Sequence, residues 1–209
     1  MLGGEKVVVL GLARGGVPVA YEVARILDCP LDVLVVRKIG VPLQPEVAMG
    51  AIGEDGSLVV EYATVKMFGV SEPQFQLVVA RERSELERRI GIYRRGRPSL
   101  ILENEVVVIV DDGLATGATA HVACDVARAR GATRVIVAAP VASNAAANRM
   151  DVIADQFVSL ERVGGPFAVG QWYEDFVPTS DQQVIDDLNN AAPADIPGAQ
   201  PKSTRPRKS

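Results

Sequence analysis

Residues 106–120 have the sequence VVVIVDDGLATGATA, and the change of pattern inside this stretch decides the fold. Residues 106–110 are all β-branched, which predicts a short strand buried on both faces. Two acids follow directly, and a loop of small residues then leads into a helical pattern over 118–130. Gly131 stands where a glycine commonly ends a helix. The stretch therefore predicts a buried strand, an acidic turn and a helix in succession.

Apolar strands alternate with helices along most of the chain. Further strands are predicted at 7–10, 31–36, 58–60, 134–139 and 156–160, and further helices at 17–27, 71–95, 143–154 and 180–190. Strands that are apolar throughout need cover on both faces. The pattern therefore predicts an α/β fold of three layers, in which helices flank a mainly parallel sheet. Residues 40–57 are rich in glycine and proline, and we expect them to form an irregular loop.

Length and composition indicate one domain in a reducing compartment. The 209 residues suit a single domain, placed at 1–190, and the Pro-, Ala- and Lys-rich residues 191–209 predict a disordered tail. Cys29 and Cys124 form neither a metal-ligand spacing nor a disulfide framework. With no run of about 18 apolar residues and no signal-peptide pattern, we expect a cytoplasmic protein without a membrane partner. The pI of 5.2 argues against nucleic acid as a partner.

The acidic turn and the small-residue loop carry the strongest chemical signal. Ligands of parallel α/β sheets bind at the carboxyl ends of the strands, which is where Asp111 and Asp112 stand. Carboxylates accept hydrogen bonds from sugar hydroxyls and favour positive charge that develops on a ribose. The loop at 115–119 enters a helix, so its backbone amides and threonine hydroxyls can hold a phosphate. The alternative is an ordinary glycine turn with solvated acids.

This stretch resembles the phosphoribosyl-pyrophosphate signature of the type I phosphoribosyltransferases. The residues that carry the resemblance are Asp111, Asp112, Ala115, Thr116, Gly117, Ala118 and Thr119. The span 7–184 as a whole resembles the phosphoribosyltransferase-like domains of bacteria. The resemblance implies that the two acids hold the ribose hydroxyls and that 115–119 hold the 5′-phosphate. It also implies a small irregular hood, placed at about 161–180 together with the loop 40–57.

The resemblance implies an enzyme that transfers the phosphoribosyl group from phosphoribosyl pyrophosphate to a nitrogenous acceptor, a nucleobase by expectation, and releases pyrophosphate. Mg²⁺ is the implied cofactor. Because Mg²⁺ prefers oxygen ligands and substrate phosphates, we expect it to arrive with the substrate near Asp111 and Asp112 and to need no dedicated protein site.

Two further loops are expected to bind the pyrophosphate end of the substrate. Arg14, Gly15 and Gly16 follow the first strand, where the family often has a non-proline cis peptide, and Arg37 and Lys38 end the second strand. The resemblance implies that these residues hold pyrophosphate, with Arg14 and Lys38 taking part in catalysis. The alternatives are a plain strand-to-helix turn and basic side chains that reach solvent.

The aromatic segment 169–176 is expected to contact the acceptor. In the family, an aromatic ring of the hood stacks on the acceptor base, which points to Trp172, Tyr173 and Phe176. The alternative is that these rings close the hydrophobic core.

A non-catalytic module that senses phosphoribosyl pyrophosphate is the alternative function. In that case the arginines of 71–97 would contact RNA, whereas the interleaved Glu82, Glu85 and Glu87 favour a solvated, ion-paired helix face. The basic residues after the first two strands favour catalysis, because a sensor of ribose phosphate has less need of a pyrophosphate site. The acceptor and the oligomeric state stay open, with a homodimer among the options.

Overall fold

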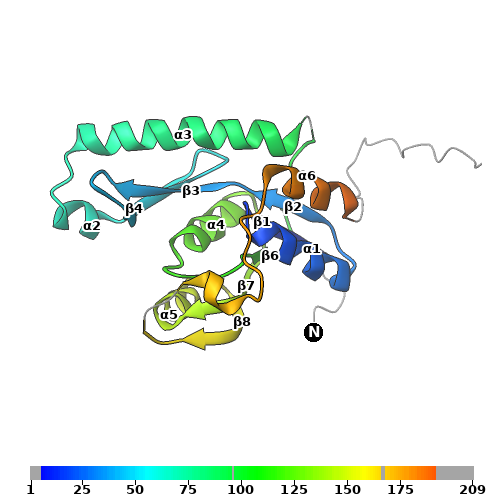
Figure 1. Cartoon of the computed structure of the whole chain (residues 1–209). Helices are drawn as coiled ribbons and strands as arrows, with labels where there is room; N and C mark the ends of the chain where they lie inside the picture. The colour runs from blue at the N-terminus through cyan, green and yellow to red at the C-terminus, as the bar shows by residue number, and fades with distance from the viewer. Residues whose placement is uncertain (1–5, 96, 166–167, 192–209) are drawn as a thin grey trace, which may run out of the picture.

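The computed structural model describes residues 6–95, 97–165 and 168–191 (Figure 1). Its centre is a parallel sheet of five strands in the order β2-β1-β6-β7-β8. The strands are β1 (Val7–Leu12), β2 (Leu31–Leu34), β6 (Val106–Val110), β7 (Arg134–Ser143) and β8 (Gln156–Val163). This sheet confirms the α/β class and the parallel arrangement expected from the apolar strands.

Helices cover both faces of the sheet, as the buried strands require. Alternate residues of β6 point to opposite faces, with Val107 and Ile109 in one apolar cluster and Val106 and Val108 in the other. The first cluster is completed by α4 (Ala118–Ala129) and α5 (Asn144–Ile153). The second is completed by α1 (Gly16–Leu27), α3 (Glu72–Arg94) and α6 (Asp181–Asn190). The molecule therefore has the three layers predicted.

A smaller antiparallel sheet replaces the irregular loop expected at 40–57. Its strands, in the order β3-β4-β5, are β3 (Val36–Val41), β4 (Gln44–Gly53) and β5 (Leu58–Val60). The expectation was wrong because some of the glycines lie within strands: a Cβ atom at Gly50 would collide with the backbone of Val59 on the neighbouring strand, whereas Gly56, with φ 83°, does lie in a turn. Figure 1 shows this sheet, with α2 (Tyr62–Met67) and α3, projecting to one side of the main sheet.

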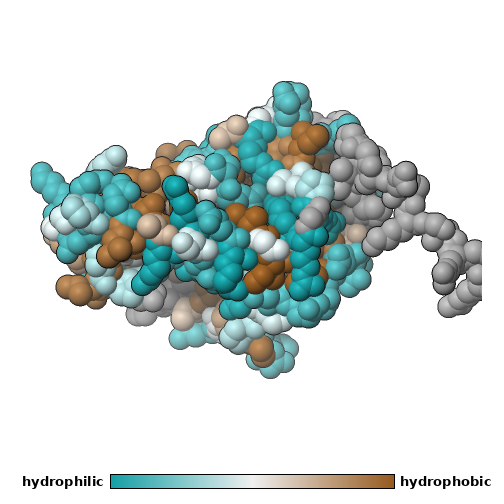
Figure 2. Space-filling view, turned by 90° about the horizontal axis from the view of Figure 1, so that it is seen from above, coloured by the Kyte–Doolittle hydropathy of each residue, from teal (hydrophilic) through white to brown (hydrophobic). Residues whose placement is uncertain are grey.

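The long helix α3 is only partly the solvated face expected from its charges. Glu85 does form surface ion pairs with Arg88 and Arg89, and hydrophilic side chains predominate on the face viewed in Figure 2. The expectation was wrong for Glu82, which is 5% exposed. It was also wrong for the last residue of the helix, Arg94, whose side chain is 11% exposed.

A buried ionic network holds the end of α3 against the main sheet. Arg94 contacts Asp32 of β2 and Glu54 at 2.9 Å each, and Arg130 after α4 contacts Glu54 at 2.9 Å. Asp32 also accepts from the backbone amide of Leu100 at 3.0 Å. Because each acid has several charged or polar partners, burial of these charges is compensated.

The ends of several elements differ from expectation by a few residues. β2 ends at Leu34, and β7 and β8 run on to Ser143 and Val163. Ser143 caps α5, because its hydroxyl accepts from the Ala146 amide at 3.0 Å. The disordered tail expected at 191–209 lies, except for its first residue, outside the described residues. In the described part of the chain, no helix is both long and apolar enough to cross a membrane.

Candidate functional site

The loop after β1 packs directly against the acids that follow β6. A Cβ atom at Gly15 would collide with the carboxylate of Asp112, and one at Gly16 would lie 2.5 Å from the Val110 carbonyl oxygen and 2.9 Å from the Asp111 Cα. Gly16 therefore requires glycine for steric reasons, because its nearest neighbours are backbone atoms, whereas a side chain at Gly15 would displace the Asp112 carboxylate. The structure thus brings together two of the sequence motifs that were expected to form the site.

Asp111 and Asp112 form a half-buried pair at the carboxyl end of β6. The Asp111 carboxylate accepts from the Asp112 backbone amide at 2.9 Å. Burial raises the pKa of Asp111 well above its usual value, and the negative charge of Asp112 raises it further. Burial also raises the pKa of Asp112. Both carboxylates would therefore be stabilised by hydroxyl donors or by a positive charge placed beside them.

The small-residue loop is held at the N-terminus of α4 by contacts with β7. The Leu114 amide donates to the Val141 carbonyl at 2.9 Å, and the Ser143 hydroxyl donates to the Ala115 carbonyl at 2.7 Å. Gly117 has φ 71°, a conformation that favours glycine. Ala115 and Thr116 are exposed, so the loop presents backbone to solvent beside a helix N-terminus. This arrangement can bind an anion.

Thr116 and its neighbours complete this loop. The Thr116 hydroxyl accepts from the Ala118 amide at 3.3 Å, and the Thr119 side chain is half-buried in the first turn of α4. The Thr116 hydroxyl therefore stabilises the start of α4 and is also exposed at the surface.

Arg14, in the loop after β1, contacts an acid at the start of α6. The Ala13–Arg14 peptide bond is cis, as the family resemblance predicts. The Arg14 guanidinium lies 3.7 Å from the carboxylate of Asp181, the first residue of α6. The Tyr93 hydroxyl donates to that same carboxylate oxygen at 2.7 Å.

The sequence did not indicate that Asp181 contacts Arg14 or that Tyr93 contacts Asp181. A local signal existed only for the place of Asp181, because a helix was expected at 180–190. Its contact with Arg14 joins distant parts of the chain and has no sequence signature.

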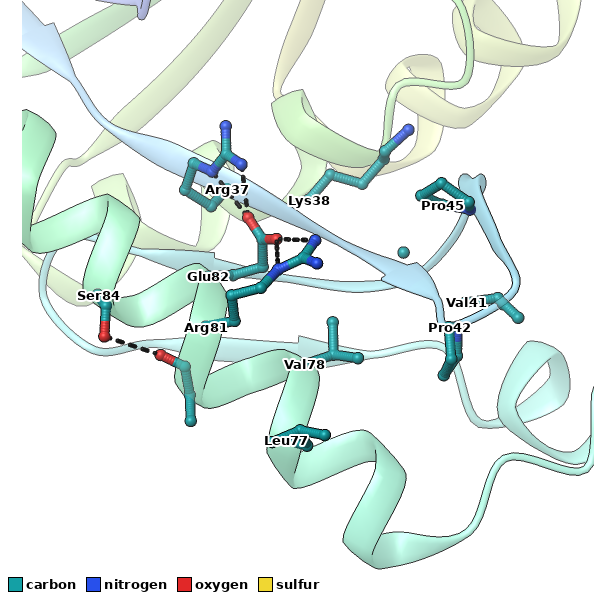
Figure 3. A pocket seen from close by; sticks show the side chains of 12 residues that line it. Arg37, Lys38, Val41, Pro42, Pro45, Leu77, Val78, Arg81, Glu82 and Ser84 are labelled. Atoms are coloured by element: carbon teal, nitrogen blue, oxygen red, sulfur yellow. Dashed lines mark hydrogen bonds and ion pairs between the residues drawn. The ribbon is translucent and has the colours of Figure 1, made fainter.

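Arg37 and Lys38 do not end the second strand, as was expected, because β2 stops at Leu34 and the chain continues into β3 of the small sheet. There they line a cavity of about 840 Å³ between the small sheet and α3 (Figure 3). Arg37 donates two hydrogen bonds to Glu82, at 2.6 and 2.9 Å. Arg81 contacts the other oxygen of Glu82 at 3.0 Å. Apolar side chains, among them Leu77 and Val78, form another part of the wall. Arg37 is thus engaged in an ion pair that its sequence context did not indicate.

The aromatic segment lies beside the acids. The Tyr173 hydroxyl donates to the Asp112 carbonyl at 2.7 Å, and the Tyr173 and Phe176 ring centroids are 5.3 Å apart. Burial raises the pKa of Tyr173 to about 12. Trp172 and Phe176 are both 47% exposed, so these rings close the core only in part.

The donor set at the strand ends suits a hard cation that is shared with a substrate. Asp111 and Asp112 offer carboxylate oxygens, the ligand type that Mg²⁺ prefers. Among the residues that the structure describes, no group of three or more His, Cys, Asp or Glu side chains could hold a metal ion. The carboxylate oxygens of Asp111 and Asp112 fit a Mg²⁺ ion that is bound together with a substrate.

Comparison with known proteins places these features in one family. Residues 2–172 match the family described as phosphoribosyl transferase domain. Two Mycobacterium tuberculosis proteins provisionally named phosphoribosyl transferases, Rv0571c and MT0597, are each 50% identical over 190 residues, which are 91% of this chain and 43% of the relative. The chain therefore spans less than half the length of these curated relatives.

A solved structure with the same fold is also similar in sequence. The crystal structure of TT1426 from Thermus thermophilus is 43% identical, with a TM-score of 0.78 over 92% of this chain and 91% of that one. The similarity extends over nearly the whole of both chains, so the two proteins share one fold.

Proposed function

The chain belongs to the phosphoribosyl transferase domain family, and from that premise we propose that it transfers the phosphoribosyl group of phosphoribosyl pyrophosphate to a nitrogenous acceptor, a nucleobase. The observation that carries the proposal is the packing of Gly15 and Gly16 against Asp111 and Asp112. This contact puts a basic, glycine-rich loop beside two carboxylates at one edge of a parallel sheet, where ligands of such sheets bind.

Each part of the substrate has a matching group, at this edge or, in the case of Lys38, on β3 of the small sheet. The residues 115–119 offer backbone amides at the start of α4 to the 5′-phosphate. Asp111 and Asp112 accept hydrogen bonds from the ribose hydroxyls, which offset the burial that raises the pKa values of both acids and the repulsion that raises the pKa of Asp111 further. Arg14 and Lys38 supply positive charge to the pyrophosphate.

The same acids assist bond cleavage at C1 of the ribose. As the bond to pyrophosphate lengthens, positive charge develops on the ribose ring, and Asp111 and Asp112 stabilise it because they are fixed and half-buried. Mg²⁺, when bound with the substrate, neutralises part of the charge of the leaving pyrophosphate. Tyr173 and Phe176 form the aromatic surface beside Asp112, on which a planar acceptor can stack.

The test is turnover of labelled phosphoribosyl pyrophosphate by the purified protein, with Mg²⁺ and a panel of nucleobases. We expect pyrophosphate release that depends on one class of acceptor and that is lost in the double variant Asp111→Asn/Asp112→Asn. Binding of phosphoribosyl pyrophosphate without turnover of any acceptor would instead support the alternative, a non-catalytic sensor. Retention of RNA at physiological salt would strengthen that alternative.

A further inference from the structure

We propose that Asp181 and Tyr93 are positioning residues for Arg14 and for the loop that lies against Asp111 and Asp112. The proposal rests on the proposed function, because it concerns the pyrophosphate end of the same substrate. It assigns a role in this site to α6 and α3, which lie far from the loop in sequence.

The loop after β1 is fixed on one side and needs an anchor on the other. Its glycines touch the acids after β6, so the backbone at Gly15 and Gly16 cannot move toward them. The Arg14 side chain points instead to α6, where one guanidinium nitrogen lies 3.7 Å from Asp181. An arginine has five N–H donors in a rigid fork, so this single contact can orient the group while other donors stay directed to an anion.

Asp181 is itself held in place, which a surface carboxylate usually is not. Its Oδ1 atom accepts a 2.7 Å hydrogen bond from Tyr93, whose side chain is buried with 3% exposure. Burial, together with this hydrogen bond, raises the pKa of Tyr93 from 10.0 to about 12, so its hydroxyl remains a donor even above pH 10. The Ser180 hydroxyl accepts from the Gln183 amide at 3.1 Å and thereby fixes the start of α6.

α6 is also anchored along its length. Val184 and Leu188 are buried, and Arg97 donates to the Leu188 carbonyl at 2.6 Å. The series Tyr93–Asp181–Arg14 therefore connects two packed helices to a loop of the site. A residue can position Arg14 only if it is itself held in place, and Asp181 meets this requirement.

Conservative variants separate the charge of Asp181 from its hydrogen bond. Asp181→Asn keeps an acceptor for Tyr93 and loses the charge that attracts Arg14, whereas Tyr93→Phe keeps the ring and frees the carboxylate. Calorimetry would measure the affinities for Mg²⁺-phosphoribosyl pyrophosphate and for ribose 5-phosphate. We expect each variant to weaken phosphoribosyl pyrophosphate by about three- to fivefold, the scale of a partly exposed ion pair, and to bind ribose 5-phosphate like the parent.

Two controls make the result specific. Asp186→Asn removes a carboxylate from the same helix at an exposed position and should change neither affinity. In an Arg14→Ala background, Asp181→Asn should have no further effect, because its target is gone. Thermal unfolding of each variant verifies that it is folded.

The inference is overturned if Asp181→Asn binds phosphoribosyl pyrophosphate as the parent does or more tightly. It is also overturned if both ligands weaken equally, or if the effects of Asp181→Asn and Arg14→Ala simply add. A parent protein that binds no phosphoribosyl pyrophosphate would refute the proposed function, and this inference with it. A parent that binds it while the variants behave normally would refute the positioning role alone.

Discussion

The Tyr173 hydroxyl donates a 2.7 Å hydrogen bond to the backbone carbonyl of Asp112, so the segment after β8 is tied to the acids at the end of β6. The bond leaves the Asp112 carboxylate available for other partners. It also explains why an aromatic residue with a hydroxyl, rather than a phenylalanine, stands at this position.

We expect Tyr173→Phe to lower the free energy of unfolding by about 0.5–1.5 kcal/mol, the usual contribution of one hydrogen bond. The pKa of Tyr173 is raised from 10.0 to about 12, so the folded protein favours the neutral phenol. The stability that this hydroxyl contributes is therefore fully present below pH 10 and is lost as the pH rises toward 12. Chemical unfolding at pH 9 and at about pH 11.5 measures this, because the difference between parent and variant should shrink at the higher pH. An unchanged difference would contradict the assignment.

Asp111 and Asp112 should lower the free energy of unfolding at neutral pH, although turnover depends on them. Burial raises the pKa values of Asp111 and Asp112, so the folded protein binds protons more readily than the unfolded chain. Stability should therefore rise as the pH falls from neutral toward the ordinary aspartate range, and the double Asn variant should lose this dependence. We expect the variant to be at least as stable as the parent at pH 7 and to lose turnover by about 10²-fold or more.

Thermal unfolding from pH 4.5 to 7.5, with turnover measured on the same samples, checks both statements. A double variant that turns over normally would rule out the ribose-binding role. A variant that is markedly less stable than the parent would show that the acids support the fold.

The sequence predicted the parts of the fold that depend on local pattern. β6 and the start of α4 lie where the buried run and the small-residue loop indicated, because both signals are confined to adjacent residues. The small sheet escaped prediction because Gly50 and Gly53 resemble turn residues in a sequence. In the structure they let neighbouring strands and side chains approach closely.

For the candidate site too, the sequence indicated local motifs but not the contacts between distant elements. The sequence indicated the acids, the loop 115–119 and the glycines after β1, because each motif stands at a strand end. It could not indicate that Glu82 pairs with Arg37 or that Asp181 pairs with Arg14. Those contacts depend on how α3 and α6 pack on the sheet, and no short-range pattern encodes that packing.

The buried ionic network supplies a matched pair of variants. Glu54 contacts Arg94 and Arg130 with a side chain that is 7% exposed, whereas Glu85 contacts Arg88 and Arg89 at the surface. Glu54→Gln should destabilise the protein by about 3–5 kcal/mol, because it removes the carboxylate that pairs with Arg130 and one of the two acids that contact Arg94. Glu85→Gln should cost no more than about 1 kcal/mol. Urea unfolding compares them, and equal losses would mean that the network contributes no more than a surface pair.

The loop at the start of α4 should bind a simple anion. Crystals soaked in sulfate should show the ion on the backbone amides of 115–119, since that loop is exposed at a helix N-terminus. Gly117→Ala should reduce this binding, because φ 71° is unfavourable for alanine and the loop would have to change shape. Sulfate bound only elsewhere in the parent crystals would argue against a 5′-phosphate site here.

The neighbouring cations Arg37 and Lys38 should have different roles. Arg37 is hydrogen-bonded to the buried Glu82, so Arg37→Ala should mainly reduce the free energy of unfolding, by about 1–3 kcal/mol.

Lys38→Ala should weaken the binding of phosphoribosyl pyrophosphate by about 1.5–3 kcal/mol, the range for a charged hydrogen bond, if Lys38 contacts the pyrophosphate as proposed. Ribose 5-phosphate lacks the pyrophosphate, so its affinity for the Lys38→Ala variant should stay close to the parent value. Calorimetry with both ligands and urea unfolding of both variants test the assignment. If Lys38→Ala weakened the two ligands equally, Lys38 would be a structural residue and the pyrophosphate would have to be held by the loop after β1 alone.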